Sequence, residues 1–201
     1  MSQLASLPQR QTGEVTPAQT ARVAELSVVV PTFKESGNVA ELVQRIDAAL
    51  EGVDWEVIFV DDDSPDGTSD VAKAMAAADP RVRCLRRVSR RGLAGACIEG
   101  MLSSSAAYVG VMDADLQHDE NLLPRMLATL RRGDTDLVVG SRYIAGGSAS
   151  AFSKRRSMIS KTAGSLARAL TRVELTDPMS GFFMMRRDRF DPIAGSLSIC
   201  V

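Results

Sequence analysis

Short apolar runs alternate along the chain with segments in which apolar residues recur at helical spacing. The runs predict strands at 26–30, 57–60, 82–85, 108–112, 137–140 and about 182–185. The periodic segments predict helices at 39–50, 71–78, 92–106, 122–130 and 158–170, the first of them capped by Ser36. This alternation predicts a single α/β domain with a mostly parallel, Rossmann-like sheet and helices on both faces.

The first 22 residues or so have neither an apolar core nor a basic start, which argues against a signal peptide. No apolar run approaches the roughly 20 residues that a membrane-spanning helix needs. We therefore predict a flexible tail over 1–24, an α/β domain over 25–201 and no transmembrane segment.

Composition narrows the function classes. The chain of 201 residues has a formal net charge of −1, which gives no sign of nucleic-acid binding. The charges are nevertheless uneven: the segment 142–173 carries seven basic residues and no acid, whereas acids gather at 61–63 and at Asp113 and Asp115. An acidic cluster together with a basic stretch predicts a metal site beside an anion site.

Three predicted strands end in polar segments, at 31–35, 61–67 and 113–117. Ligands of open parallel sheets bind at the carboxyl ends of the strands, so these segments are expected to form one site. Asp113 and Asp115 are two residues apart, and in extended backbone such side chains point to the same side. Two carboxylates that share one cation favour Mg²⁺ or Mn²⁺, with positions left open for substrate phosphates.

Six ordered strings make the chain resemble a known family. LSVVVPTFKESGN, VIFVDDDSPDGTSDVA, RRGLAGACIEGM, VMDADLQHD, VVGSRY and LTDPMSGFFMMRR, spread over about 25–190, resemble the family-2 glycosyltransferases of the GT-A fold. The MDADLQH and TDPMSGF strings favour the branch that resembles dolichyl-phosphate-mannose synthases and uses polyprenyl phosphate acceptors. The resemblance implies inverting, metal-dependent transfer of a sugar from a nucleotide diphosphate to that lipid. Mannose from GDP-mannose is the expected donor, UDP-sugars are the alternative, and the expected location is cytoplasmic, peripheral at the membrane face.

On the donor side, the resemblance implies a nucleoside pocket and a metal site. The pocket would use Pro31, Phe33 and Glu35, with Asp61 and Asp63 near base and ribose, and the metal would bind Asp113, Asp115 and Gln117 against the diphosphate. Similar enzymes have tyrosine and asparagine after Pro-Thr where this chain has Phe33 and Lys34, so one hydroxyl is lost.

On the acceptor side, Arg142 would meet phosphate or donor sugar, and Asp177 and Ser180 would lie near the acceptor. A phosphate monoester has a second pKa of about 6 and is a dianion at neutral pH, so it needs cations more than a general base. The basic stretch fits that need, and we predict that the acceptor phosphate binds Arg142, Lys154, Arg155, Arg156 and Ser180. Any single one of these cations would ordinarily be a solvated surface charge.

Two other functions stay open. In a family-2 transferase with a soluble or polysaccharide acceptor, Asp177 would act as the catalytic base. In a non-catalytic nucleotide-binding remnant the metal pair would usually be broken, whereas Asp113 and Asp115 are both present. His118 is interpreted as a helix-start residue rather than a ligand. Similar enzymes continue past the SGFF string, so we expect this chain to be truncated at its C-terminal end.

Overall fold

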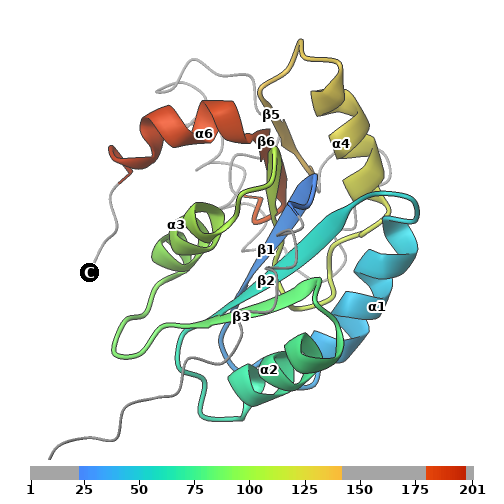
Figure 1. Cartoon of the computed structure of the whole chain (residues 1–201). Helices are drawn as coiled ribbons and strands as arrows, with labels where there is room; N and C mark the ends of the chain where they lie inside the picture. The colour runs from blue at the N-terminus through green and yellow to red at the C-terminus, as the bar shows by residue number, and fades with distance from the viewer. Residues whose placement is uncertain (1–22, 142–179, 198–201) are drawn as a thin grey trace, which may run out of the picture.

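A computed structural model describes residues 23–141 and 180–197, and the structural statements below concern those residues. Six strands form one sheet in the order β3-β2-β1-β4-β6-β5 (Figure 1). Their bounds are Leu26–Thr32 for β1, Trp55–Asp61 for β2, Val82–Arg86 for β3, Tyr108–Val111 for β4, Leu137–Val139 for β5 and Phe183–Arg186 for β6. The pairs β1–β2, β2–β3 and β1–β4 are parallel, whereas β6 runs antiparallel to β4 and to β5. The predicted mostly parallel sheet is confirmed.

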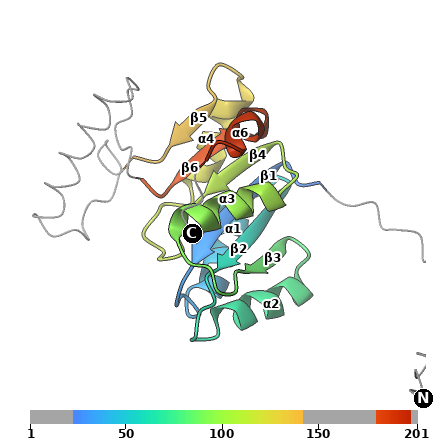
Figure 2. The ribbon, with the colours of Figure 1, turned by 90° about the vertical axis from the view of Figure 1, so that its left-hand side faces the viewer.

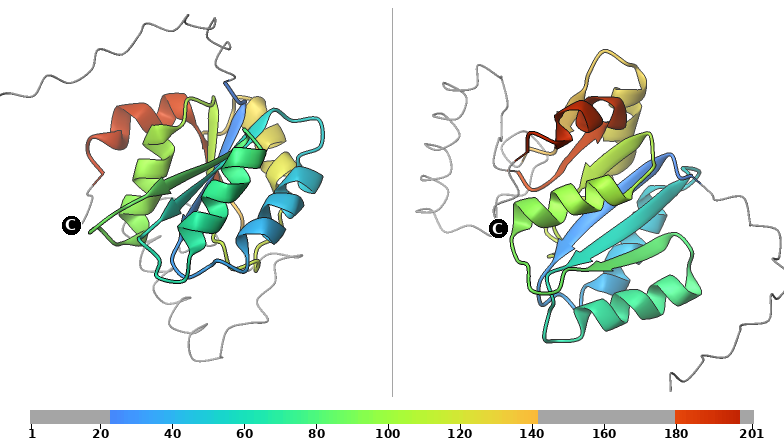
Figure 3. Two further views of the ribbon diagram at one scale, coloured as in Figure 1. Left: turned by 60° about the horizontal axis from the view of Figure 1, so that its bottom comes forward. Right: turned by 60° about the vertical axis from the view of Figure 1, so that its left-hand side comes forward.

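Helices cover both faces of this sheet, as the alternation predicted. On one face lie α1 (Val39–Ala49), α2 (Thr68–Ala78) and α4 (Leu122–Arg131), and on the other lie α3 (Leu93–Ser103) and α6 (Arg187–Ala194). Figure 2 looks onto the face with α3 and α6, and the left view of Figure 3 shows the sheet between the two helical layers.

The two cores follow from the alternation of side chains along buried strands. In β1, Val28 and Val30 pack into the core under α1, α2 and α4, while Val29 packs into the core under α3 and α6. All three are fully buried, which explains why the strand reads as an unbroken apolar run rather than as an alternating one.

The first predicted helix begins at Val39 as expected, but its predicted cap is wrong. Its N-cap is Asn38, not Ser36, and the Asn38 side chain donates to the Glu35 carboxylate (2.6 Å) instead of capping the helix. The Ser36 backbone N–H donates to Asp66 (3.2 Å), a contact between two loops that the cap motif does not predict.

Helix α6 was not predicted, because half of its sequence RDRFDPIA is charged and it contains Pro192. Arg187 anchors it: Nε donates to the carbonyl of Ala106 and Nη2 to that of Met101, both at 2.8 Å. Near the end of α3 the Met101 carbonyl also accepts from the Ser104 N–H (3.3 Å), so Arg187 is its second donor. The predicted helix over 158–170 lies outside the described residues, and the division into a tail over 1–24 and a domain over 25–201 stays a prediction.

In the parts of the chain that the structure describes, no helix is both long and apolar enough to cross a membrane.

Close packing of α3 on the sheet depends on Gly100. A Cβ at this position would lie 2.8 Å from Cγ2 of Val60 and would also overlap Val29. We expect Gly100→Ala to lower the free energy of unfolding by about 1–3 kcal/mol, because overpacking outweighs the better helix propensity of alanine. Urea unfolding measures this. Gly195→Ala, where a Cβ would meet open space, is the control, and equal stability of the two variants would contradict the packing argument.

Candidate functional site

The loops that follow β1, β2, β3 and β4 meet at the carboxyl edge of the sheet, and each contains a strained residue. Among the described residues, the non-glycine positions with positive φ are Lys34 (65°), Asp63 (58°), Ser89 (60°) and Leu116 (59°), one in each of these loops. Such conformations cost of the order of 1–3 kcal/mol each and gather at functional sites. Backbone strain therefore marks the same edge that the polar strand ends predicted.

Asp61 organises the first two loops from a buried position. Its carboxylate accepts hydrogen bonds from Thr32 Oγ1 (3.2 Å), from the Ser64 backbone N–H (3.0 Å) and from Ser64 Oγ (2.5 Å). Ser64 Oγ in turn accepts from the Lys34 N–H (3.0 Å). Asp63 differs from Asp61, because it is partly exposed and pairs with Arg86 (Nε to Oδ1, 2.7 Å). Nucleotide contact by Asp61 and Asp63 stays a prediction.

An aromatic ring lies open to solvent at this edge. Phe33 is 42% exposed, and the guanidinium of Arg91 lies 4.8 Å from its ring centroid. Lys34 places its ammonium 5.5 Å from the same centroid. Pro31 and Glu35, the other residues predicted for the nucleoside pocket, flank this ring in the chain and are partly buried. Phe33 together with Lys34 and Arg91 makes a surface on which a planar ring and an anion could bind together.

The predicted metal pair, Asp113 and Asp115, lies directly after β4. The Asp113 side chain is 38% exposed, and its Oδ2 lies 3.3 Å from His118 Nε2. Gly181 makes room for it, since a Cβ there would lie 2.8 Å from the carboxyl carbon of Asp113. Asp115 and Gln117 are exposed, and Asp115 Oδ1 accepts from the Gln117 N–H (3.1 Å).

These residues suit a cation that takes few protein ligands. Within residues 23–141 and 180–197, no group of three or more His, Cys, Asp or Glu could hold a metal by itself. Mg²⁺ and Mn²⁺ accept one or two carboxylates and complete their shell with water and phosphate oxygens. The cradle that Gly181 leaves for Asp113 and the exposure of Asp115 fit such a site.

An apolar groove of about 640 Å³ opens beside Asp113. Its walls come from α3, β5, β6 and α6, and Ser180, Gly181 and Asp113 lie in its lining. Several of its residues are large and exposed, namely Leu93, Leu137, Ile193 and Leu197. Ser180 Oγ donates to the Gly140 carbonyl (2.6 Å), so the hydroxyl predicted to bind phosphate also joins the end of β5 to β6.

Comparison with known proteins assigns the family. The profile of Glycosyl transferase family 2 matches residues 27–193, a span that contains all four loops of the strained edge. The chain belongs to glycosyl transferase family 2.

Two curated relatives show the level of similarity. Dolichol-phosphate mannosyltransferase of Pyrococcus furiosus is 40% identical over 166 residues, and polyprenol monophosphomannose synthase of Mycolicibacterium smegmatis is 35% identical over 181 residues. The matches cover 82% and 88% of this family 2 chain. The chain spans 47% of the length of the first relative and 67% of the second.

A solved structure shares the fold. Glucosyl-3-phosphoglycerate synthase of Mycobacterium tuberculosis, in complex with Mn²⁺, UDP and glucosyl-3-phosphoglycerate, superposes with a TM-score of 0.62 at 21% identity. The match covers 82% of this chain and 57% of that one. The GT-A fold predicted from the motifs is confirmed.

His118 was misjudged from the sequence. Helix α4 begins at Leu122 with Asn121 as its N-cap, so His118 does not start a helix. Its ring lies 5.1 Å from that of Phe182 and reaches back to Asp113. Because Phe182 comes from the far end of the chain, no local pattern signals this contact.

Several predicted acceptor residues lie outside the described residues: Arg142, Lys154, Arg155, Arg156 and Asp177. Their roles stay predictions for this family 2 chain.

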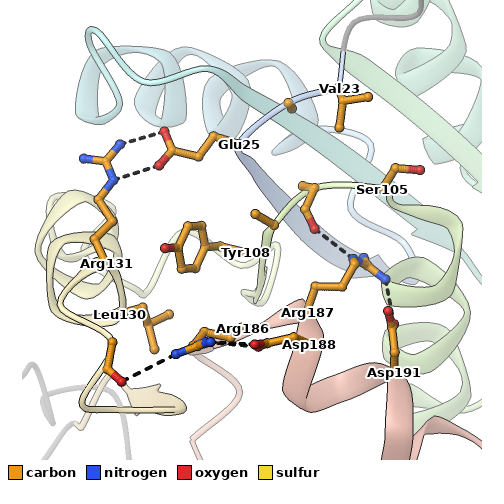
Figure 4. A pocket seen from close by; sticks show the side chains of 14 residues that line it. Val23, Glu25, Ser105, Tyr108, Leu130, Arg131, Arg186, Arg187, Asp188 and Asp191 are labelled. Atoms are coloured by element: carbon orange, nitrogen blue, oxygen red, sulfur yellow. Dashed lines mark hydrogen bonds and ion pairs between the residues drawn. The ribbon is translucent and has the colours of Figure 1, made fainter.

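A second hollow of about 800 Å³ lies at the opposite, amino-terminal edge of β1 and β4 (Figure 4). Its charged side chains are paired with one another: Arg131 with Glu25 (2.6 Å), Arg186 with Asp188 (2.5 Å) and Arg187 with Asp191 (3.2 Å). The hydrogen bonds that Arg131 donates to the Glu25 carboxylate raise the pKa of Arg131 above its usual range. These contacts explain the hollow as an ion-paired surface, in which the pair Arg131–Glu25 joins α4 to the segment before β1 and the other two pairs are local to the start of α6.

Besides Asp61, a second carboxylate joins the first two loops of the site. Asp66 accepts from the Thr68 hydroxyl (2.6 Å), the Thr68 N–H (3.1 Å) and the Ser36 N–H, and these bonds, the Thr68 hydroxyl first, lower its pKa to about 2.

We expect Asp66 to contribute stability that is present above about pH 4 and is lost as pH falls to about 2, because the charged form is favoured in the folded state. Asp66→Asn should flatten the dependence of unfolding free energy on pH between these limits. Urea unfolding at pH 4, 3 and 2 measures this, with the exposed Asp134→Asn as control. An unchanged pH slope in Asp66→Asn would contradict the assignment.

Proposed function

We propose that this chain carries the donor site and reaction centre of a metal-dependent, inverting mannosyltransferase that uses GDP-mannose and a polyprenyl phosphate. The observation that carries the proposal is the apolar groove that opens beside Asp113. A transferase with a sugar acceptor needs polar contacts for hydroxyl groups at this place, whereas an isoprenoid chain needs apolar walls next to a charged reaction centre.

The donor would bind across the strained edge. Phe33 and Glu35 would contact the nucleoside, and the partly exposed Asp63 is better placed to contact it than the buried Asp61. Asp113, Asp115 and Gln117 would hold Mg²⁺ or Mn²⁺ against the diphosphate. The complex of the M. tuberculosis synthase with Mn²⁺ and UDP supports this arrangement. The mannosyl specificity named in the curated relatives supports mannose, and GDP is the nucleotide that we propose with it.

When bound, the cation would stabilise the negative charge of the departing nucleotide diphosphate. The acceptor phosphate would need no general base, since it is a dianion at neutral pH. One of its oxygens would form a bond to the sugar C1 from the face opposite the leaving group, as the bond from C1 to the diphosphate oxygen breaks. Mannosyl phosphoryl polyprenol and GDP would result, with inversion at C1.

The acceptor lipid would lie with its phosphate near Asp113 and its chain in the groove. Repulsion between the phosphate and the carboxylates would be offset by the metal and by the predicted cations Arg142, Lys154, Arg155 and Arg156. The exposed side chains of Leu93, Ile193 and Leu197 would then face the bilayer. We accordingly propose that the chain works at the cytoplasmic surface of a membrane.

The first test is whether nucleotide binding is coupled to the metal. We expect Mn²⁺ to tighten GDP binding to the wild-type chain at least tenfold, about 1.4 kcal/mol. Asp113→Asn combined with Asp115→Asn should remove this difference, and Gly181→Ala should reduce it by displacing the Asp113 carboxylate. Calorimetric titrations with MnCl₂ or with EDTA measure the effect.

Gly195→Ala is the control for Gly181→Ala and should bind GDP as the wild type does. Equal GDP affinity of the wild type in Mn²⁺ and in EDTA would refute the metal site and favour the non-catalytic alternative. Tighter binding of UDP than of GDP would reverse the assignment of the base.

The second test separates the lipid acceptor from a soluble one. Leu93 and Leu102 are both exposed leucines of α3, but Leu93 lines the groove and Leu102 is not among its lining residues. We expect Leu93→Gln to weaken binding of farnesyl phosphate about fivefold to tenfold, because about 1 kcal/mol of apolar contact is lost. Leu102→Gln should leave it unchanged.

Both variants can be titrated with farnesyl phosphate and with inorganic phosphate by calorimetry. If wild-type chain binds the two compounds equally, the groove holds no isoprenoid chain, and the alternative with a soluble acceptor and Asp177 as base is favoured.

A further inference from the structure

A buried arginine closes a ring of contacts beside the donor site. Arg87 follows β3 directly and is 2% exposed. Its Nη1 donates to Asp62 Oδ1 (2.5 Å) and to the Gly92 carbonyl (3.1 Å). The Gly92 N–H donates to the other oxygen of Asp62 (2.7 Å). One guanidinium, one carboxylate and one residue's backbone thus join the loop after β2 to the loop after β3.

A carboxylate of α3 also balances the charge of Arg87. Its Nε lies 3.3 Å from Glu99 Oε1 on α3, and Glu99 pairs with the exposed Arg90 as well (2.9 Å). This Nε is buried and makes no hydrogen bond of good geometry among the described residues. Buried ion pairs of this kind add little stability compared with apolar residues of the same volume, so stability alone gives a weak reason for an arginine here.

These contacts around Arg87 hold the segment from Ser89 to Gly92 in a backbone conformation that it would not adopt unaided. Ser89 has a φ of 60° and Gly92 a φ of 134°, both unfavourable for ordinary side chains. Conformations of this kind persist only where surrounding contacts impose them. Arg91, inside the same segment, is the residue whose guanidinium lies over the exposed ring of Phe33.

Asp62 gives the contacts around Arg87 a second connection to the site. Its neighbours in the chain are Asp61, which organises the turn after β2, and Asp63, which pairs with Arg86. A side chain that fixes the Asp62 carboxylate therefore restrains the backbone on which Asp63 is presented. None of these contacts requires Arg87 itself to reach the exposed surface.

We propose that Arg87 is a positioning residue of the donor site. Through Gly92 it sets the place of Arg91 over Phe33, and through Asp62 it restrains the backbone that carries Asp63, without touching the donor. The proposal rests on the proposed function only in taking a nucleotide as the ligand of this edge.

Arg87→Lys is the informative variant. Lysine keeps the charge, but its single ammonium cannot reproduce the planar fork that reaches Asp62, Gly92 and Glu99 together. Asp62→Asn is a milder second variant, because its amide can still accept from Arg87 on one side while it loses the acceptor for the Gly92 N–H. Arg90→Lys, exposed and paired with the same Glu99, is the matched control.

The first measurement reports the position of the Arg91 guanidinium in the absence of any ligand. Phe33→Trp places an indole under Arg91, and acrylamide quenching reports how well the guanidinium covers it, with the buried Trp55 as a constant background. We expect Arg87→Lys and Asp62→Asn to raise the quenching to the level of Arg91→Gln, and Arg90→Lys to leave it unchanged. Unchanged quenching in a folded Arg87→Lys or Asp62→Asn variant would overturn the proposal, whatever the chain binds.

The second measurement is a double-mutant cycle on GDP affinity in Mn²⁺. In the wild-type background Arg87→Lys should weaken binding about fivefold to twentyfold, and in the Arg91→Gln background by less than twofold. Unfolding midpoints in urea should shift equally in both backgrounds. Equal loss of GDP affinity in both backgrounds would show a purely structural role and overturn the proposal. A wild-type chain that binds neither GDP nor UDP would instead refute the proposed function, and the quenching experiment would still decide the role of Arg87.

Discussion

The parallel pairing of β1 with both β2 and β4 is the constraint on which the site depends. It sets Thr32 beside Asp61 in register, and it aligns Val111, the last residue of β4, with Val29, three residues before the end of β1, so that the chain leaves all three strands on the same side of the sheet. The loops after these strands therefore start from adjacent points on one edge. Asp61 then joins the first two loops by hydrogen bonds that are local in space but about 30 residues apart in sequence. Without this register, the exposed ring of Phe33 and the carboxylates of Asp113 and Asp115 would not share an edge.

The loops at this edge carry backbone strain, and packing in the interior offsets its energetic cost. Each positive-φ residue costs about as much as the burial of one large apolar side chain contributes. The strands beneath the loops are buried on both faces, and α3 packs so closely that Gly100 has no room for a Cβ. A rigid, well-packed sheet can hold loops in unfavourable shapes, and the same loops would relax if they carried only their own contacts. This division explains why the polar network around Asp61, Asp62 and Arg87 is buried although neighbouring residues such as Phe33 and Arg91 are exposed.

The sequence predicted the parts that depend on local order. Continuous apolar runs identified the strands, and the polar residues after them identified the carboxyl edge, because the chain passes directly from strand to loop. Contacts made between distant segments were not predictable in this way. His118 contacts Phe182, and Arg187 of α6 donates to the Met101 carbonyl near the end of α3. The groove is lined by residues about 100 positions apart in the sequence. Helix α6 was missed for a related reason, since its half-charged sequence is held by these distant contacts and not by its own periodicity.

The burial of Arg87 is a further feature that the local sequence could not predict. In the sequence it is one basic residue among several between 81 and 91, and nothing local separates it from its exposed neighbours. The fold separates them: Arg86 turns to Asp63, Arg91 to Phe33, and Arg87 alone of the three is buried. Side chains of consecutive residues in extended backbone alternate in direction, so Arg86 and Arg87 at the end of β3 supply a surface cation and a buried one. The acidic run Asp61-Asp62-Asp63 at the end of β2 divides in the same manner, with Asp62 directed to the buried arginine and Asp63 to the exposed one. Two short charged runs on neighbouring strands thus form two layers, an inner one that fixes the loops and an outer one that remains available to a ligand.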